Sequence, residues 1–474
     1  MSNTALYIVV VCLSIYAWKD WFKSLCGLIL LTVIAAQPGF PQSFGNIQGL
    51  NLLNIVFTNV LLAWLMNRRR QGLFWDMPRN ITVFLLLWLG VILIGWVWMI
   101  FDTSNLKGFT LIDLISEQLI NTIKWPLLGL LLFDGCRTHH QVKVALACIL
   151  LFFALWTFQI VRVVPPEIVL ESGYSKLSDD DFRSDLGISP NGAGKMMSGV
   201  PWAMLAVVPL LKIRICRFFM LGLCFIGIYT LALTGSRSAY IACGTTLILL
   251  CIMRWRKYLL LLPFAVLILP IALPGASGWM TSGFEATNVA GESETDKNSV
   301  TSGRNLIWPM VLAKIYESPV FGFGREAMQR TGLKDELENK YGLIEGVAVN
   351  HPHNAYLLIL LDSGLIGLII IVGFHMVIWA YCARLFVDRG DPLCTAVGGL
   401  TLALLTGNLV SCMGGQSFYA QEIDVGLWCA IGVMLRLYVE RDRLNTDVNG
   451  APAVSTRATE DIRVSQTPLG WINS

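Results

Sequence analysis

The chain has 474 residues, of which 55% are hydrophobic and 14% are charged. Soluble domains carry about 25% charged residues, so a wet exterior cannot cover this much apolar surface and the chain must lie in a membrane. The composition excludes a soluble enzyme, a disordered protein and a nucleic-acid binder, and the net charge of +3 is too small to indicate a polyanionic partner.

Apolar runs follow one another along most of the chain. A helix needs about 20 apolar residues to cross a hydrocarbon core of roughly 30 Å. The sequence therefore predicts an all-α polytopic membrane protein with about 12–13 transmembrane helices. The clear runs are 50–66, 80–101, 112–134, 141–160, 191–211, 216–234, 236–253, 258–273, 354–382, 393–413 and 422–438. Two under-length runs, 4–17 and 24–36, precede them, and we expect a hairpin there, with half-depth insertion as the alternative.

Lys and Arg are unevenly divided between the predicted short loops. Loops 18–23, 67–79, 135–143, 212–218, 254–257 and 384–392 hold 16 of them, whereas loops 37–49, 102–111 and 414–421 hold only Lys107. Because basic loops stay in the cytoplasm, the first set is predicted to be cytoplasmic, together with a disordered tail over 439–474. The predicted order is N-terminal helices over 1–273, a periplasmic loop over 274–353 and three helices over 354–438.

The outer side receives two long segments, 161–190 and 274–353, and loops this long are usually functional. Within the second segment, Thr301 to Ser318 predicts an amphipathic helix that is capped by Ser302 and lies flat on the outer leaflet. Its predicted apolar face consists of Ile307, Trp308, Val311, Leu312 and Ile315.

Three short patterns imitate cofactor sites. Ser189 to Met196 looks like a phosphate loop but lacks its first glycine and the hydroxyl residue after lysine. Gly322 to Ala327 matches G-x-G-x-x-A, but no βαβ unit surrounds it, so we expect a tight glycine turn. Asp179 to Asp181 offers oxygen ligands for a hard cation, although a solvated acidic loop explains these residues as well. We predict no metal ion and no cofactor.

Several basic residues fall at the outer ends of predicted spans, where the positive-inside rule disfavours them. Arg237 lies in a small-residue turn with almost no loop, so its guanidinium needs an anion or backbone carbonyls. Arg304 stands near the start of the amphipathic helix, whose free N–H groups favour an anion. We interpret both as anion-binding residues. The alternatives are a snorkelling or ion-paired side chain at Arg237 and a solvated one at Arg304.

A second group of polar residues lies around the start of the 191–211 span. Arg183 precedes the Pro190-Asn191 turn, and a salt bridge to nearby acids is the alternative to an anion contact. Lys195 lies one turn inside the span, so its ammonium needs a polar pocket or must snorkel to the interface. Arg183, Asn191 and Lys195 are therefore candidate substrate-binding residues.

Two histidines, His351 and His353, come directly before a long predicted span. His353 would lie at the outer N-terminus of that helix, where the positive helix end lowers the imidazole pKa and keeps the ring able to accept a proton. A capping or interfacial histidine is the alternative. Asp362 follows about two turns further in and needs a partner, because a buried carboxylate is costly.

This arrangement suits transfer of a group from a lipid-linked diphosphate. Arginines at headgroup depth bind a diphosphate through charge-assisted, bidentate contacts. They also stabilise the charge that builds on it as the leaving group, a role that could replace a metal ion. The acceptor hydroxyl then needs only a positioned base, for which His353 is the best candidate.

Four short motifs occur in order between residues 230 and 370. They are Thr234-Gly235-Ser236-Arg237-Ser238-Ala239, then Ser302-Gly303-Arg304 with Ile307-Trp308, then Ser318-Pro319-Val320-Phe321-Gly322-Phe323-Gly324, and last His353-Asn354-Ala355-Tyr356 with Asp362-Ser363-Gly364-Leu365-Ile366-Gly367. With the long outer loop between spans, this set resembles the O-antigen ligase and O-antigen polymerase superfamily of bacterial membrane glycosyltransferases. The segment from Arg183 to Asn191 is similar to a further element of that family.

The resemblance implies a C-type glycosyltransferase (GT-C) fold in the bacterial inner membrane, with the active site on the periplasmic side. It implies inverting, metal-independent transfer of a glycan from undecaprenyl diphosphate, with Arg237 and Arg304 holding the diphosphate. His353 would be the catalytic histidine, although His351 lies close enough to compete for that role. The remaining candidate substrate-binding residues are Arg183, Asn191, Lys195, His351, Asn354, Tyr356 and Asp362.

The implied partners are the lipid-linked glycan donor, membrane lipids and an acceptor. The acceptor would be a growing glycan, the lipid A–core of lipopolysaccharide or a protein, and its choice would lie in loops 161–190 and 274–350. A multi-span transporter or lipid-linked glycan flippase is the main alternative, but the notable charges cluster at the outer rim and no halves repeat. A scaffold for an envelope assembly machine is the third hypothesis.

Overall fold

The computed structural model describes residues 3–41, 51–106, 108–170, 179–281, 286–287, 293–294, 301, 303–341, 351–415 and 417–450. Helices account for almost all of its regular structure, which confirms the predicted all-helical class. The exception in the described part is a two-residue antiparallel ladder between β1 (Ala286–Thr287) and β2 (Ser293–Glu294), which hydropathy did not predict.

The N-terminal half is a series of apolar helices. They are α1 (Asn3–Ala17), α2 (Trp21–Ala35), α3 (Leu52–Gln71), α4 (Arg79–Phe101), α5 (Leu111–Ile115), the π-helix η1 (Ser116–Asn121), α6 (Thr122–Gly135) and α7 (His139–Val163). The predicted hairpin is present as α1 and α2, and Ser24 of α2 donates its hydroxyl hydrogen to the carbonyl of Leu13 (2.8 Å). The predicted span 112–134 is interrupted by η1, because i→i+5 hydrogen bonds replace the α-helical ones there.

The middle and C-terminal helices follow the predicted runs with some breaks. They are α10 (Pro190–Met197), α11 (Val200–Val207), η2 (Val208–Leu210), α12 (Arg214–Leu233), α13 (Arg237–Met253), η3 (Arg256–Leu261), α14 (Leu262–Ala272), α20 (Ala355–Val387), α21 (Pro392–Ser411), η4 (Glu422–Asp424) and α22 (Val425–Gly450). Pro201 opens α11 and Pro209 lies in η2, so the predicted run 191–211 is built from three short pieces.

Six helical segments are long and apolar enough to cross a membrane: Arg79–Phe101, His139–Val163, Pro190–Leu210, Arg214–Leu233, Ala355–Val387 and Pro392–Ser411. Shorter apolar helices cover Thr4–Ala17, Trp21–Ala35 and Arg237–Met253. The chain is therefore a multi-pass membrane protein. The larger number of spans that hydropathy predicts stays a prediction.

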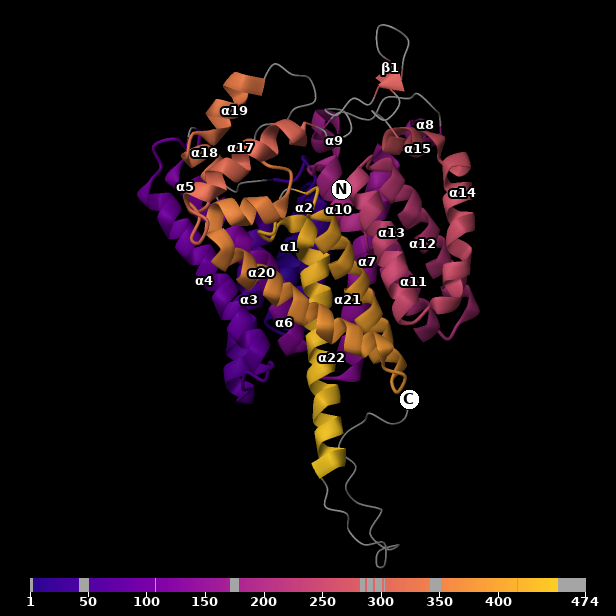
Figure 1. The fold of residues 1–474 in the computed structure, drawn as a ribbon. Coiled ribbons are helices and arrows are strands. Elements are labelled where there is room, and N and C mark those ends of the chain that lie inside the picture. The colour runs from indigo at the N-terminus through magenta and orange to yellow at the C-terminus, as the bar shows by residue number, and fades with distance from the viewer. Residues whose placement is uncertain are drawn as a thin grey trace, which may run out of the picture.

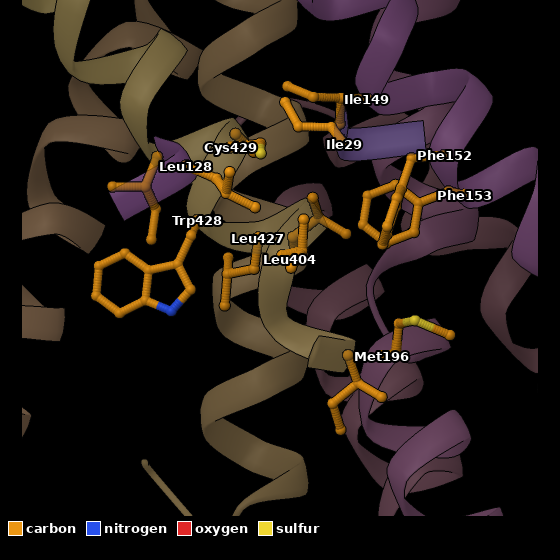
Figure 2. Packing of buried hydrophobic residues seen from close by; sticks show 14 of the residues in the cluster. Ile29, Leu128, Ile149, Phe152, Phe153, Met196, Leu404, Leu427, Trp428 and Cys429 are labelled. Atoms are coloured by element: carbon orange, nitrogen blue, oxygen red, sulfur yellow. The ribbon is translucent and has the colours of Figure 1, made fainter. Parts of the chain in front are cut away.

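The core of the bundle lies around α22 and its neighbours α6, α7 and α21. Figure 2 shows Trp428 and Cys429 of α22 among Leu128 of α6, Ile149 of α7 and Leu404 of α21. The crossing of α6 and α22 is so close that a Cβ on Gly432 would overlap the carbonyl oxygen of Gly129. Small residues at a helix crossing allow this approach in a membrane, where close packing replaces the hydrophobic driving force.

Arg436 of α22 is fully buried and, through Asp76, links this helix to two predicted cytoplasmic loops. Its Nη1 and Nη2 donate to the Asp76 carboxylate (2.7 and 3.0 Å), and Arg137 also contacts Asp76 (2.9 Å). Burial works to raise the pKa of Asp76, but the hydrogen bonds and charges of Arg436, Arg137 and Arg443 outweigh it and lower that pKa to about 2. Asp76 is therefore ionised at neutral pH and compensates the buried guanidinium.

The two long segments predicted on the outer side come together at one end of the bundle. Figure 1 shows α8 (Glu167–Leu170), α9 (Asp179–Leu186), α15 (Pro274–Thr281), α17 (Arg304–Glu317), α18 (Ala327–Arg330) and α19 (Leu333–Tyr341) at the upper end. The far end of α22 extends from the opposite, lower end. This placement agrees with the predicted sidedness, although the arrangement of helices does not identify the side of the membrane.

The predicted amphipathic helix exists as α17, but it faces protein. It begins at Arg304, with Gly303 at the N-cap position in the left-handed conformation (φ 75°), and the predicted cap Ser302 lies outside the described residues. Ile307, Val311 and Ile315 are buried in a cluster with residues of α18, α19 and α20. The buried face of α17 thus packs on α18, α19 and α20, whereas the position of the helix on the outer leaflet stays a prediction.

α20 is broken at Gly364, and the preceding segment repairs the break. Gly364 has φ 63° and ψ −165°, a conformation essentially confined to glycine. The N–H groups of Phe323 and Gly324 donate to the carbonyls of Leu361 and Asp362 (2.9 and 2.7 Å) on one side of the break.

On the other side of the break, the N–H groups of Leu365 and Ile366 donate to the carbonyls of Pro319 and Val320 (2.9 and 3.3 Å). The third and fourth motifs, separate in sequence, thus form one hydrogen-bonded unit at the head of α20. Backbone groups released by the break find partners within the protein, as a low-dielectric environment requires.

Candidate active site

His353 is held at the entry to α20 by contacts on both sides. Asn354 is the N-cap residue, and its Oδ1 accepts from the N–H groups of Tyr356 and Leu357 (3.0 and 3.2 Å). On the other side, Trp308 of α17 donates its indole N–H to the carbonyl of Pro352 (2.8 Å). His353 itself has φ 47°, and left-handed backbone at a non-glycine residue is uncommon and concentrates at functional sites.

The His353 imidazole is neutral at physiological pH. Burial lowers its pKa to about 3, and the nearby His351 ring and Arg304 guanidinium add to the effect. The two histidine rings meet edge to face with their centroids 4.0 Å apart. The sequence predicted a lowered pKa from the positive helix end, whereas in the structure burial is the largest cause. Either way the ring can accept a proton at neutral pH.

Arg304 is the first residue of α17 and its guanidinium is only partly satisfied. Nη2 donates to the carbonyl of Gly414 (3.2 Å). Within the part of the chain that the structure describes, the buried Nε has no hydrogen-bond partner and no carboxylate forms an ion pair with Arg304. Burial and the nearby charge of Arg237 both lower the pKa of Arg304 from its usual range. A half-buried guanidinium whose Nε has no acceptor favours an anionic ligand.

Arg237 reaches the same place from α13. It is the first residue of that helix, after the N-cap Ser236. Gly414 lies between the two arginine-bearing helices, because a Cβ there would come within 2.6 Å of the Ser238 Cβ and 3.4 Å of Arg304 Nη2. The structure therefore brings together three predicted residues, Arg237, Arg304 and His353, from α13, α17 and the entry to α20.

A cavity of about 540 Å³ opens beside this cluster. Three of the predicted substrate-binding residues line it. They are Arg183 of α9, His351 in the segment before α20, and Asp362 of α20. Asp362 is buried, and its partners are the N–H of Ala327 (3.2 Å) and the hydroxyl of Tyr419 (2.9 Å). Its carboxylate thus positions the turn before α18, an arrangement that the sequence did not specify.

The other candidate substrate-binding residues either interact with groups of the protein itself or lie in a helix turn outside the cavity lining. Lys195 is 6% exposed and forms an ion pair with Asp424 (3.0 Å), and its Nζ also donates to the carbonyl of Ser417 (3.2 Å). This pair occupies the ammonium, so we leave Lys195 out of the proposed site. Tyr356 donates its hydroxyl hydrogen to the carbonyl of Leu409 (2.9 Å), Asn354 caps α20, and Asn191 lies in the first turn of α10.

Arg325 is a site residue that the sequence interpretation missed. The expected glycine turn is present, with φ 70° at Gly322 and 84° at Gly324, and Arg325 follows it directly. Arg325 is 6% exposed, its Nε donates to Oε1 of Gln118 (2.6 Å), and its guanidinium lies 3.8 Å from the ring centre of Tyr419. An arginine inside a matched motif at the outer end of the bundle was the available signal.

Glu117, Glu326 and Glu422 were also missed. All three line the cavity, together with Arg325. They come from η1, from the turn before α18 and from η4, so no local pattern connects them. Within the described residues, no group of three or more His, Cys, Asp or Glu could hold a metal ion. The side chains of Asp179 to Asp181 lie outside the described residues, and their interpretation stays untested.

Comparison with known proteins finds one family model that is similar to part of the chain. Residues 222–372 match a family model described as O-antigen ligase. The matched range runs from α12 into α20 and contains Arg237, Arg304, Arg325 and His353. No curated protein matches the chain.

Proposed function

We propose that this chain, whose residues 222–372 belong to the O-antigen ligase family of lipid-linked glycan transferases, transfers a glycan from undecaprenyl diphosphate to an acceptor hydroxyl. Arg237 and Arg304 bind the diphosphate, and His353 is the base. The observation that carries the proposal is a neutral, half-buried imidazole beside two guanidinium groups that act on one another through their charges. The reaction is inverting and needs no metal ion.

The proposed chemistry balances without a further reactant. The acceptor oxygen attacks the anomeric carbon from the face opposite the diphosphate, and a ring nitrogen of His353 takes the hydroxyl proton. The bond between the anomeric carbon and the phosphate oxygen breaks, and its electron pair leaves with undecaprenyl diphosphate. Attack from the opposite face inverts the anomeric configuration. Arg237 and Arg304 stabilise the charge that grows on the leaving group more strongly in the transition state than before it.

Donor binding also prepares the base. The positive charge of Arg304 contributes to the lowered pKa of His353. A diphosphate bound to Arg304 offsets that charge, which comes after burial and His351 among the causes, and so raises the pKa of the imidazole in part. A base is most effective when its pKa lies near the operating pH. In this proposal, bound donor therefore makes the histidine a somewhat stronger base.

The proposed setting is the periplasmic face of the bacterial inner membrane, with the helices arranged in a GT-C fold. The grouping of α9, α17, α18 and α19 at one end of the bundle supports a site at headgroup depth. Growing glycan, lipid A–core and protein hydroxyls remain the candidate acceptors. Deletion of the gene followed by electrophoresis of surface glycans separates two of them. Loss of a ligase leaves bare core, whereas loss of a polymerase leaves core with a single repeat.

The direct test is transfer by the purified protein with His353→Gln and Arg304→Ala. Glutamine keeps polar contacts but cannot act as a base, so we expect transfer to fall by about 10²–10⁴-fold with donor affinity retained. Arg304→Ala should weaken binding of undecaprenyl diphosphate itself. His140→Gln and Lys314→Ala are matched controls, since His140 is exposed and Lys314 of α17 pairs with Glu317.

Normal transfer by His353→Gln would remove the base from the proposal. Unchanged donor affinity in Arg304→Ala would remove that arginine from the site. Movement of a lipid-linked glycan across sealed vesicles without covalent change to it would support a flippase instead.

A further inference from the structure

The cavity beside the proposed diphosphate site has a different chemical character. Its lining includes His351, whose ring touches the ring of His353, so it reaches the proposed base from the side. Arg304, Arg237 and His353 are not among the residues that line it. The proposed base thus lies between a pair of arginines and a separate cavity.

The cavity presents hydrogen-bonding groups from several elements. Glu117 comes from η1, Glu326 from the turn before α18 and Glu422 from η4. In the described part of the chain, Oε1 of Glu422 and Nη1 of Arg325 are buried without a hydrogen-bond partner. Arg325 is 6% exposed, so this donor lies in a nearly closed environment. Buried polar atoms left in this way indicate a ligand that supplies both hydroxyl donors and oxygen acceptors.

Irregular backbone places two of these side chains. Glu326 has φ 59°, which is left-handed at a non-glycine residue, and Glu117 lies in a π-helix. Both features cost conformational energy and concentrate at functional sites. Two hydrogen bonds fix other parts of the cavity lining. The Tyr419 hydroxyl donates to Asp362, and Arg325 donates to the amide oxygen of Gln118.

The lining distinguishes among possible ligands. The lining carries four acidic side chains against two arginines, a balance that disfavours a diphosphate, and its many polar groups are unsuited to an acyl chain. Carboxylates and amide oxygens accept hydrogen bonds from vicinal hydroxyls, Arg325 donates to sugar oxygens, and Trp125 and Tyr419 add aromatic rings. The volume lies within the range of roughly 300–1,000 Å³ that small-molecule sites occupy. A hydroxyl-rich saccharide fits these properties.

We propose that this cavity binds the terminal sugars of an acceptor glycan and presents one of their hydroxyls, past His351, to His353. The inference rests on the proposed function and deepens it, because it assigns the acceptor to the saccharide class. Donor and acceptor then approach His353 from two sides, the donor at the arginine pair and the acceptor at the carboxylate-lined cavity. Glu326 and Glu422 are positioning residues that hold the acceptor sugar.

The test separates acceptor binding from donor binding. Initial rates are measured for Glu326→Gln and Glu422→Gln with saturating lipid-linked donor and varied core oligosaccharide as the probe. Loss of a hydrogen bond to a charged group should raise the KM for the oligosaccharide by about 10–100-fold. The Kd for undecaprenyl diphosphate should stay within about two-fold of the wild-type value. Glu338→Gln on the exposed side of α19 is the matched control and should leave both constants unchanged.

Two outcomes overturn the inference while the proposed function stands. The first is that donor affinity falls in the glutamine variants while the acceptor KM is unchanged. The second is that a peptide hydroxyl accepts the glycan where oligosaccharides do not. If the wild-type protein shows no transfer, the proposed function fails. Saturation-transfer NMR with the same oligosaccharide then tests separately whether the cavity binds a saccharide. Binding to the wild-type protein that is lost in Glu326→Gln supports the saccharide site, and no binding to the wild-type protein refutes it.

Discussion

Arg304 interacts electrostatically with His353 and Arg237 at the proposed site. Its charge adds to the burial that keeps His353 neutral, while the charge of Arg237 makes Arg304 itself less favourable as a cation. Two cations held together without a carboxylate on Arg304 raise the energy of the empty site. In the proposed mechanism, the diphosphate relieves this repulsion, and that relief contributes to its affinity.

The first prediction concerns the titration of His353. The chain has five histidines, so selective imidazole labelling gives few NMR signals, and the signal lost in His353→Gln identifies His353. Because burial and two neighbouring groups lower its pKa to about 3, the ring should remain neutral at pH 5. Saturation with undecaprenyl diphosphate should move the titration to higher pH.

The sign of the linkage is fixed by the direction of this shift. A histidine whose pKa is lower in the folded state takes up protons more readily when unfolded, so its contribution to folding becomes less favourable as pH falls from about 6.5 towards 3. The wild-type protein should lose more stability than His353→Gln over this interval. Titration of the assigned signal near pH 6.5 in the absence of donor would contradict both expectations.

Sequence reasoning proposed Arg237, Arg304 and His353 because each lies in a short motif at the predicted start of a helix, and the structure brings the three close together. It could not find the partner of Lys195, since Asp424 lies 229 residues further along the chain. Glu326 and Glu422 each look like an ordinary solvated carboxylate in sequence. Only the folded chain brings them to one cavity, so their role had no local signal.

At the scale of elements, the break in α20 explains why two family motifs occur together. Residues 319–324 and 361–366 exchange four backbone hydrogen bonds around Gly364. The approach requires glycine on both sides, because a Cβ on Gly322 would come within 2.6 Å of the Asp362 backbone. The sequence predicted a glycine turn and a long helix here. It did not predict that the turn supplies hydrogen-bond partners to the backbone of the helix at its break.

The second prediction tests this junction with Gly364→Ala. Alanine is strained by about 1–3 kcal/mol in this backbone conformation, and its Cβ would overlap the carbonyl of Val320. We expect a lower midpoint of thermal unfolding in detergent and reduced transfer, because Arg325 and Asp362 adjoin the junction. Gly90→Ala is the matched control. Gly90 lies inside α4 with open space around it, so alanine there should be neutral or slightly stabilising. Equal midpoints for the two variants would show that the junction does not depend on glycine.

The amphipathic helix shows where periodicity is informative and where it is not. The spacing of Ile307, Val311 and Ile315 correctly identified one buried face of α17. Periodicity does not say what covers a face, and here α18, α19 and α20 cover it instead of lipid. Leu312, assigned to the same face from sequence, is 39% exposed.

At the scale of the whole molecule, the two ends of the bundle differ in composition and role. One end gathers α9, α17, α18 and α19 around the proposed site, as Figure 1 shows. The other carries the network of Arg436, Asp76 and Arg137. The basic loops predicted to be cytoplasmic contribute Asp76 and Arg137 to this second end. Two of the six basic loops that the charge bias grouped are therefore in contact through this network, whereas their side of the membrane is a prediction.

The third prediction concerns sidedness. Cysteines are introduced singly as Glu338→Cys in α19 and Arg389→Cys in the turn between α20 and α21. The background is Cys12→Ser with Cys216→Ser, since the other ten cysteines are buried. A membrane-impermeant thiol reagent should label Glu338→Cys in intact spheroplasts and Arg389→Cys only after the membrane is opened. The reverse pattern would place the site in the cytoplasm and exclude a periplasmic acceptor.

The discontinuity at Gly364 separates α20 into two mechanical parts. The outer part, from Ala355 to Ser363, is anchored by Asn354, by the Cys412 carbonyl and by strand-like exchange with residues 319–324. The inner part crosses towards the opposite end of the bundle. Residues 319–324 bond to the helix on both sides of Gly364, so a segment outside α20 holds its two parts together. The discontinuity is therefore braced by the loop before α18, and a change in that loop would reach both parts of the helix.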